Sequence, residues 1–240
     1  MIYLRIALIL LWLFVSCMLG LFGCLVRWGD LNLDRDFGRF FSWGALRLSN
    51  LKASVEGLEH LEAHQPCIYV ANHQSVIDMF SFGKIYPCRT IVIGKKELRW
   101  IPLFGLFFAA AGNIMINRQK RVKAIAGLGQ AVDAIQKRNA SIWIFPEGTR
   151  NETGKGLLPF KKGAFHMAIS AGVPIVPILS SPVDLIFNWK KRTFRGGRMQ
   201  IRVLPPIPSA GLTSDDLDKL SDTVREKMLE ALRGLVTLPP

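Results

Sequence analysis

A histidine and an aspartate stand five positions apart, directly after a short apolar segment of the chain. Asn72 and His73 follow the run 68–71, and Asp78 completes the pattern N-H-x4-D. A carboxylate at this spacing can accept a hydrogen bond from one imidazole nitrogen and leave the other nitrogen free as a general base. A structural histidine is the alternative. The preceding strand favours catalysis, because α/β proteins bind ligands at the carboxyl ends of strands.

A second polar segment, Phe-Pro-Glu-Gly-Thr-Arg at 145–150, follows another apolar run. Gly148 permits a tight turn that also contains Thr149. Glu147 offers an acceptor for a hydroxyl group. Arg150 can hold a phosphate with two donors. An ordinary polar turn is the alternative interpretation. A nucleotide phosphate loop is excluded, because G-x4-G-K-[ST] requires glycine where Thr149 stands and fails again at its last position.

Two further cations stand where an anionic group could bind. Arg118 follows the apolar run 113–116, and Lys161 lies at the start of an expected helix, whose N-terminus favours anions. No serine or cysteine has the G-x-S-x-G setting of a nucleophile, and no third ligand accompanies His73 and Asp78 as a metal pair. We therefore expect neither a covalent intermediate nor a metal.

From about residue 54, short apolar runs alternate with longer helical stretches. The expected strands are 68–71, 90–93, 113–116, 141–145, 175–179 and 199–204. The expected helices are 75–84, 118–138, 160–171 and 213–235. Gln74 and Ser75 are expected to cap the first helix, with Asp78 about one turn inside it, and Thr213 with Asp216 forms a capping pattern. This alternation predicts an α/β domain with a mixed, largely parallel sheet flanked by helices.

The chain begins with a membrane-seeking segment. Residues 6–26 contain no formal charge, and about 20 apolar residues suffice to cross a hydrocarbon core. A cleaved secretory signal and a buried core helix are the alternatives. The short amphipathic stretch 37–48 suits an interfacial helix, and the charge-free stretch 100–111 suits a hydrophobic channel or a dip into the interface, or else packed core. We predict an anchoring segment over 1–50 and a catalytic domain over 51–240.

Composition excludes several other classes of protein. The 240 residues are 50% hydrophobic with a formal charge of +13, which rules out disorder and predicts an anionic partner. Four cysteines, with spacings that match no zinc pattern, read as reduced thiols. The basic stretches lack interleaved aromatics and an RNP1-like run, so we expect no nucleic acid partner.

Together these segments resemble the 1-acyl-sn-glycerol-3-phosphate acyltransferases, of the bacterial lysophosphatidic acid acyltransferase type. Four blocks carry the resemblance in order: 72–78, 112–118, 145–150 and 173–178. Asn117 departs from the family pattern, in which an aspartate is common before the arginine, and we expect little consequence.

The resemblance implies transfer of a fatty acyl group from acyl-CoA or acyl carrier protein to the sn-2 hydroxyl of lysophosphatidic acid, which gives phosphatidic acid for phospholipid synthesis. It implies that His73 is the base, that Asp78 orients it, and that transfer is direct and needs no cofactor. Arg118 and Arg150 would hold the phosphate with help from Lys161, and Glu147 would position the glycerol. The implied substrate-binding residues are Arg118, Glu147, Gly148, Thr149, Arg150 and Lys161.

The resemblance also places the protein at a membrane, the bacterial inner membrane, with the catalytic domain on the cytoplasmic side where thioester donors are found. Membrane lipids are then partners as well as substrates. Three rivals stay open at this point: a related acyltransferase acting on glycerol-3-phosphate or another lysolipid, a membrane-anchored phosphatase or hydrolase, and a non-catalytic module that binds anionic lipid. The sequence does not determine acyl-chain length, the donor, or the oligomeric state.

Overall fold

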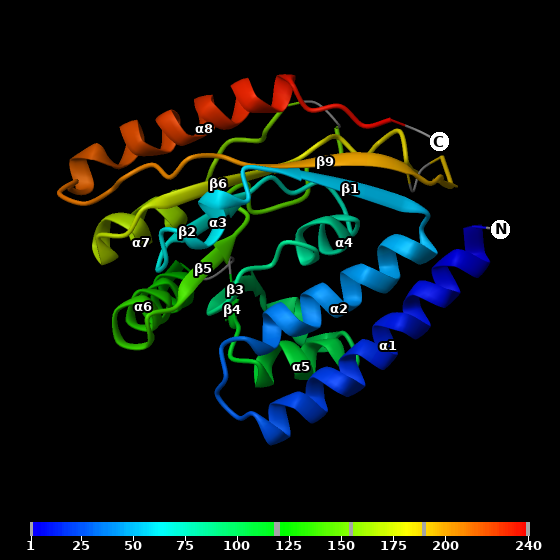
Figure 1. Cartoon of the computed structure of the whole chain (residues 1–240). Coiled ribbons are helices and arrows are strands. Elements are labelled where there is room, and N and C mark those ends of the chain that lie inside the picture. Colours follow the sequence, from blue (N-terminus) through cyan, green and yellow to red (C-terminus); the bar gives the residue numbers. More distant parts are fainter. Residues whose placement is uncertain (1, 118–120, 154–155, 189–190, 239–240) are drawn as a thin grey trace.

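The computed structural model describes residues 2–117, 121–153, 156–188 and 191–238. A mixed seven-stranded sheet runs through it (Figure 1). Its strands are β1 (Leu51–Glu56), β2 (Ile68–Ala71), β3 (Thr90–Lys95), β4 (Ile114–Ile116), β5 (Ser141–Ile144), β6 (Ile175–Ser180) and β9 (Gly197–Val203). Their order across the sheet is β1-β9-β6-β2-β5-β3-β4, and β7 (Phe187–Asn188) pairs with β8 (Thr193–Phe194) separately.

Five neighbouring strands of this sheet are parallel. β6, β2, β5, β3 and β4 run in one direction, whereas β9 is antiparallel to β6 and β1 is parallel to β9. The predicted mixed, largely parallel sheet is thereby confirmed. Because the five parallel strands end at the same side of the sheet, the residues that follow them gather there. We call this side the carboxyl edge.

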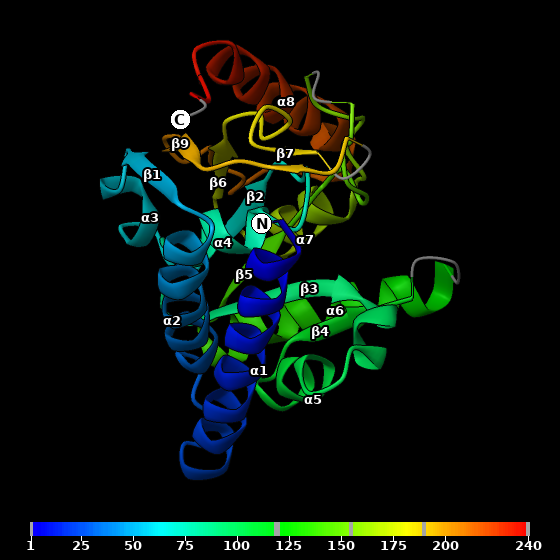
Figure 2. The same ribbon diagram turned by 90° about the vertical axis from the view of Figure 1, so that its right-hand side faces the viewer.

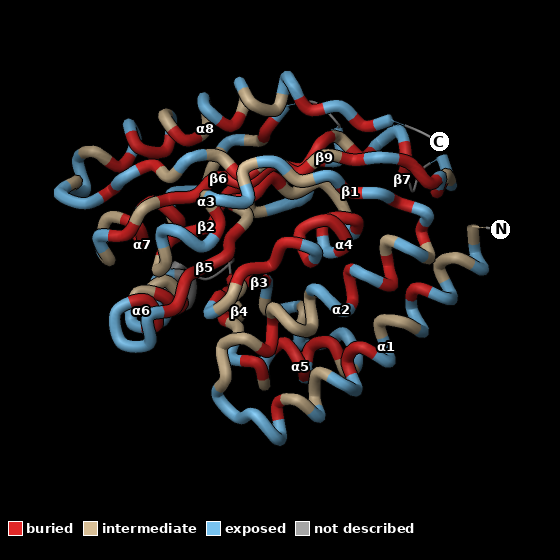
Figure 3. Tube along the Cα trace, in the orientation of Figure 1, coloured by how far each residue is buried: buried red, intermediate tan, exposed pale blue. Residues whose placement is uncertain are grey.

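Helices cover both faces of the sheet because alternate strand residues point to opposite sides. Ile68 and Val70 pack with α6 (Arg121–Arg138), α7 (Gly163–Ala171) and α8 (Leu217–Arg233), whereas Tyr69 and Ala71 pack toward α2 (Leu33–Leu48) and α4 (Asp78–Gly83). Buried residues consequently follow the central strands in an almost unbroken band (Figure 3). The predicted capping box at Thr213 and Asp216 is present and opens the turn that leads into α8.

The two N-terminal helices form a hairpin. α1 (Ile2–Val26) and α2 lie side by side on the sheet's α4 side (Figures 1 and 2). The indole of Trp12 donates to the carbonyl oxygen of Phe41 at 3.1 Å and lies against Gly44, where a Cβ would come within 2.2 Å of the ring. Gly20 packs on Phe107 of α5 (Phe104–Ala110). The two helices of the hairpin are therefore packed against each other, and α1 also packs against α5.

The hairpin also contacts α4 closely. A Cβ on Gly83 would lie 2.6 Å from the carbonyl oxygen of Gly38, and the hydroxyl of Ser42 donates to the carbonyl oxygen of Phe80. These small residues allow the backbones of α2 and α4 to approach one another. The position of α4 is consequently set from the hairpin side as well as from the sheet side.

The outer face of α1 is apolar and exposed. Its buried residues are Ile9, Ser16, Cys17 and Cys24, and its exposed large apolar residues include Leu4, Leu8, Leu11, Val15, Met18, Phe22 and Leu25. The second set recurs at helical spacing, so it forms one stripe. Within the described residues, α1 is the helix long and apolar enough to cross a membrane.

The structure differs from the sequence expectations in several elements. β1, β7, β8 and the short helix α3 (Glu59–Glu62) were not expected, because they lack a continuous apolar run. The stretch 100–111 contains α5, which buries Phe107 and Phe108 while Trp100 and Leu106 remain exposed, so it is partly core and partly surface. A short 3₁₀ helix, Lys96–Trp100, precedes it.

Candidate active site

His73 and Asp78 meet at the carboxyl edge of the sheet. The Nδ1 atom of His73 lies 2.6 Å from Oδ2 of Asp78. The imidazole keeps 22% of its surface exposed, whereas the carboxylate keeps 2%. This hydrogen bond fixes one ring nitrogen and leaves Nε2 as the nitrogen available to a substrate. The pairing expected from the spacing is present.

The Asp78 carboxylate is held by the backbone before it. Oδ2 also accepts hydrogen bonds from the amides of Gln74 at 2.7 Å and Ser75 at 3.0 Å. α4 begins at Asp78, so the expectation that this residue lies one turn inside the helix was wrong. The reason is that Oδ2 of Asp78 binds the amides of Gln74 and Ser75, which draws the backbone before Asp78 back toward its carboxylate and out of the helix. The Ser75 hydroxyl accepts from the amide of Ile77, which supports the helix entrance as expected.

Glu147 is buried beneath His73. Its Oε1 accepts the amide of His73 at 2.8 Å, and its Oε2 accepts the amide of Leu158 at 2.9 Å. Burial raises the pKa of Glu147, and the hydrogen bonds from these two amides oppose that rise. With 2% of its surface exposed, this side chain is placed to hold the backbone of the histidine.

The turn that contains Glu147 wraps around the backbone of His73. Gly148 has a φ of +73°, which glycine adopts without the strain that other residues incur. The turn brings the amide of Asn151 within 2.7 Å of the carbonyl oxygen of His73. The amide of Lys161 donates to the carbonyl oxygen of Pro146 at 2.7 Å. The segments 72–78, 145–151 and 158–161 are thereby joined at one edge.

The predicted phosphate ligands stand on this same group of segments. Thr149 and Arg150 are exposed on the turn beside Asn151, and Lys161 is exposed one residue before the backbone enters α7 through Lys162. Arg118 lies outside the described residues. The structure therefore brings Glu147, Gly148, Thr149, Arg150 and Lys161 together with the His73–Asp78 pair.

Aromatic side chains line the site beneath the imidazole. The ring of Phe145 stacks on His73 with a centroid distance of 4.2 Å and an interplanar angle of 21°. Phe82 and Trp143 pack behind Phe145. This wall limits the ring's freedom and offers an apolar surface beside the polar edge.

This arrangement is suited to removing a proton from a hydroxyl group. The imidazole is partly exposed, a buried carboxylate orients it, and cations stand on the adjoining turn. In the part of the chain that the structure describes, no group of three His, Cys, Asp or Glu side chains could hold a metal ion. General base catalysis beside a bound anion is the chemistry that these residues support.

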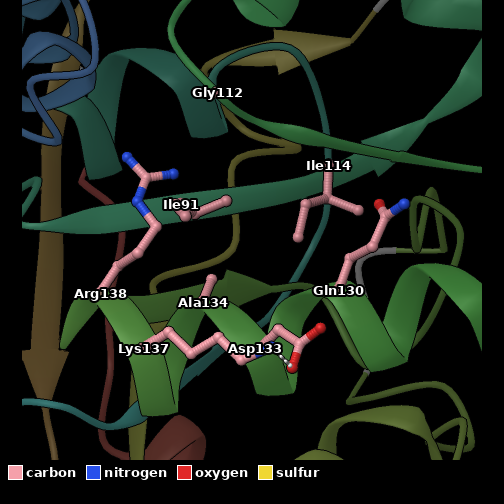
Figure 4. Close-up of a pocket in the computed structure, with 8 residues that line it drawn as sticks. All are labelled: Ile91, Gly112, Ile114, Gln130, Asp133, Ala134, Lys137 and Arg138. Atoms are coloured by element: carbon pink, nitrogen blue, oxygen red, sulfur yellow. Dashed lines mark ion pairs between the residues drawn. The ribbon is translucent and has the colours of Figure 1, made fainter.

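A cavity of about 350 Å³ lies elsewhere, at the opposite edge of the sheet (Figure 4). Its floor is apolar, with Ile91, Ile114 and Ala134, and its rim carries the ion-paired Asp133 and Lys137. Because Ile91 and Ile114 lie at the starts of β3 and β4, this cavity is separated from His73 by the length of the strands.

Several residues of the site carry functions that the sequence patterns did not predict. The side chain of Gln74 does not cap α4 but binds the backbone of 180–183, and Asn72 pairs with the backbone of Ser180. The amides of Asn151 and Leu158 hold His73 and Glu147. Alternation along 72–74 is the signal that could have shown Gln74 to face away from His73.

Comparisons with known proteins identify the family of the chain. A model of the acyltransferase family matches residues 52–181, which include every described residue of the site. The chain is therefore an acyltransferase.

Particular relatives narrow the family. Human 1-acyl-sn-glycerol-3-phosphate acyltransferase alpha is 41% identical over 190 residues, which cover 79% of this chain and 67% of that protein. The 1-acyl-sn-glycerol-3-phosphate acyltransferase of Haemophilus influenzae is 37% identical over 236 residues, which cover 97% and 95%. The chain belongs to the 1-acyl-sn-glycerol-3-phosphate acyltransferase family.

A solved structure has the same fold. The crystal structure of the 1-acyl-sn-glycerophosphate acyltransferase of Thermotoga maritima matches with a TM-score of 0.73 and 24% identity, and the match covers 98% of each chain. The agreement extends over the N-terminal hairpin as well as the sheet.

Proposed function

We propose that this protein transfers a fatty acyl group from a thioester to the sn-2 hydroxyl of 1-acyl-sn-glycerol-3-phosphate, with His73 as the general base. The observation that carries the proposal is the hydrogen bond between His73 and the buried Asp78 at an edge where Arg150 and Lys161 are exposed. The relatives named above supply the identity of the acceptor.

The reaction follows from the geometry. Nε2 of His73 accepts the hydroxyl proton as the alcohol oxygen attacks the thioester carbonyl. The carbon–sulfur bond then breaks, and the leaving thiolate takes the proton from the imidazolium. Asp78 stabilises the imidazolium and keeps Nδ1 on its own side. A positioned base of this kind supplies about 10²–10⁴-fold in rate.

The acceptor phosphate binds at the turn next to the base. Arg150 and Lys161 are cations on segments joined to the backbone of His73, and Arg118 completes the proposed set. A guanidinium holds a phosphate with two parallel hydrogen bonds, so Arg150 orients the glycerol as well as attracting it. Glu147 serves this arrangement by fixing the histidine backbone, and Gly148 and Thr149 form the turn.

The donor is acyl-CoA or acyl carrier protein, and the reaction uses no cofactor. A thioester is already activated, so alignment of the two substrates contributes most of the remaining acceleration. Neither donor is favoured by the described residues.

We place the protein at the surface of a membrane through the apolar stripe of α1. The opposite side of α1 is occupied by α2 and α5, and α2 carries Arg35, Asp36 and Arg39 beside it. A vertical crossing would draw these charges toward the hydrocarbon, which is costly. The hairpin is therefore proposed to lie in one leaflet, where lysolipid reaches the site without leaving the bilayer.

The catalytic domain is proposed to face the cytoplasm, at the inner membrane if the source is bacterial as the resemblance implies. Thioester donors are cytoplasmic, and all four cysteines are free thiols in the structure. Disulfides are rare in such a compartment, so the free thiols support this side.

One assay tests the reaction. Membranes that contain the chain, or its His73→Ala variant, are incubated with labelled 1-acyl-sn-glycerol-3-phosphate and each thioester in turn. The wild type should form phosphatidic acid, and the variant should lose at least about 10²-fold in kcat while remaining membrane-bound. Near-full turnover by the variant would remove His73 from the mechanism.

A panel of acceptors separates the proposal from its rivals. Glycerol-3-phosphate and other lysolipids should be acylated more slowly than 1-acyl-sn-glycerol-3-phosphate. Preference for another acceptor would reassign the substrate, and release of free acid or phosphate without acylation would indicate a hydrolase.

A further inference from the structure

Three successive residues after β2 are held from alternating sides. Asn72 binds the last residue of β6, and Gln74 binds the backbone from that residue onward, whereas His73, between them, faces Phe145 and Asp78. The alternation continues the two-residue period of the strand. The backbone on both sides of His73 is therefore held from the side of the chain opposite to the imidazole.

Asn72 continues the pairing of β2 with β6. Its Nδ2 donates to the carbonyl oxygen of Ser180 at 3.0 Å, and its Oδ1 accepts the amide of the same residue at 2.8 Å. The side-chain amide thereby acts like one more peptide unit of the ladder that ends at Ala71. Asn72 is 2% exposed, so its removal would unsettle the fold itself.

Gln74 makes a second and less buried attachment. Its Nε2 donates to the carbonyl oxygens of Ser180 and Ser181, each at 3.1 Å, and its Oε1 accepts the amide of Val183 at 3.3 Å. The backbone amide of the same residue donates to Asp78 Oδ2 at 2.7 Å. One residue therefore links the turn after β6 to the carboxylate that orients the base.

The Asp78 carboxylate depends on this link because its hydrogen bonds are unevenly distributed. Oδ2 accepts from His73, Gln74 and Ser75, whereas Oδ1 is buried and has no hydrogen-bond partner in the structure. A shift of the backbone at residue 74 would therefore move the one oxygen that holds the imidazole, and Oδ1 has no bond that would resist the rotation.

We propose that Gln74 is a positioning residue, which holds the His73–Asp78 pair in its reactive geometry by attaching the loop between them to the segment 180–183. The inference rests on the proposed function, because it assigns Gln74 an effect only through the base. It distinguishes Gln74 from a residue that merely contributes to stability.

The test uses Gln74→Met in the full-length chain in vesicles, since methionine conserves volume and removes all three side-chain hydrogen bonds. We expect kcat to fall about 10–100-fold, as displacements near 1 Å do, with the KM for 1-acyl-sn-glycerol-3-phosphate within about twofold of wild type. Gln74→Glu is the second variant. It keeps the acceptor for Val183 and loses the donors to Ser180 and Ser181, and it should show the same split between kcat and KM.

Gln65→Met is the matched control. Gln65 precedes β2 at the opposite edge, where Nε2 donates to the carbonyl oxygen of Cys88 at 2.8 Å and to the Tyr69 hydroxyl at 3.2 Å, and Oε1 accepts from the thiol of Cys88 at 3.3 Å. Gln65→Met removes the same number of hydrogen bonds as Gln74→Met, so it measures the effect of lost stability alone. Its kcat should stay within about twofold of wild type, as expected for a site remote from the chemistry.

A double-mutant cycle with His73→Ala tests whether Gln74 acts through His73. If Gln74 acts through His73, Gln74→Met should not lower the residual rate of His73→Ala further. An equal fold-loss in both backgrounds, or equal kcat values for the Gln74 and Gln65 variants, would overturn the inference. Full activity of His73→Ala would instead overturn the proposed function, so the two failures are distinguishable.

Discussion

Two buried aspartates show how differently the carboxyl edge and the hairpin are built. Asp78 is 2% exposed, and its Oδ2 receives three donors, from His73, Gln74 and Ser75. Asp34, at the start of α2, is 7% exposed, and its Oδ1 receives one amide, from Asn113 at 2.8 Å. Burial raises the pKa of Asp34 to about 7, against which the Asn113 hydrogen bond acts only in part.

The difference shows how each region accommodates a buried carboxylate. At the carboxyl edge, several hydrogen-bond donors converge on the carboxylate of Asp78 and compensate the cost of burying its charge. This charge can then stabilise the imidazolium of His73. At the hairpin, the raised pKa leaves the carboxyl partly protonated near pH 7. This carboxyl links α2 to β3 through Asn113, which donates to Asp34 and accepts the amide of Val92 at 2.7 Å. The first group suits the proposed general base, and the second connects the hairpin to the sheet.

The same substitution at both positions gives the largest expected contrast. Asp78→Asn keeps an acceptor for the backbone amides but removes the charge, so kcat should fall about 10²–10⁴-fold, as for loss of general base catalysis. Asp34→Asn should leave kcat within about twofold, because the group is remote from the base. Steady-state assays in vesicles measure both. Equal losses for the two variants would contradict the division between the regions.

Charges on the apolar stripe should affect attachment and not chemistry. Leu11 and Phe22 are 59% and 63% exposed on the apolar stripe of α1. Replacing both with Asp should lower the vesicle-bound fraction at least about tenfold, since each apolar side chain contributes about 1.5–3 kcal/mol on burial. Flotation with vesicles measures the effect.

Leu58→Asp is the control for that experiment, because Leu58 is also exposed, at 52%, but lies before α3 and not on α1. It should float like the wild type. Unchanged flotation of the double variant would place the membrane contact elsewhere.

Glu147→Gln should cause an intermediate loss of activity. An amide at this position can accept only one of the hydrogen bonds from His73 and Leu158 and turns a donor toward the other amide. A buried donor left unsatisfied costs about 1–3 kcal/mol, and displacement of the base adds a loss of about 10–100-fold in kcat. Urea unfolding and kcat measured on the same preparation separate the two. An unchanged kcat would show that His73 does not need this support.

The smallest expected effect is the pH dependence of stability at Asp34. The folded protein keeps this carboxyl protonated up to about pH 7, whereas the unfolded chain ionises near 3.8. Folding therefore takes up a proton between these values, so the free energy of unfolding falls as pH rises from about 4 through 7. Asp34→Asn should remove that part of the decline.

Thermal unfolding in detergent at pH 5 and pH 8 measures this contribution. The raised pKa of Glu147 acts in the same direction, so the comparison of wild type with Asp34→Asn isolates the share of Asp34. An identical pH dependence in both proteins would show that Asp34 is ionised throughout.

Much of the carboxyl edge could be predicted from sequence because parallel strands place successive motifs side by side. The run 68–71 before His73 and the run 141–145 before Glu147 gave both the strands and the edge at which they end. Spacing alone also predicted that Asp78 reaches the imidazole. These features depend on local period and on the direction of the strands.

The rest depends on contacts that no local pattern records. The sequence pattern predicts that Glu147 accepts a hydrogen bond from a hydroxyl group. In the structure Glu147 instead binds the backbone amides of His73 and Leu158, which lie 74 and 11 positions away in the sequence. Gln74 reads as a cap, yet its partners lie more than 100 residues further along the chain. β1, at the start of the domain sequence, pairs with β9, near its end. The short alternating pattern of β1 does not indicate this partner.

The close approach of Gly38 to Gly83 gives the hairpin a second purpose. α4 begins at Asp78 and is held against α2 by backbone contact and by the Ser42 hydroxyl. Removal of residues 1–50 would therefore remove the contacts that support α4 and Asp78. It would do more than remove the proposed membrane anchor. The proposed contact with lipid and the position of the proposed base therefore depend on the same pair of helices.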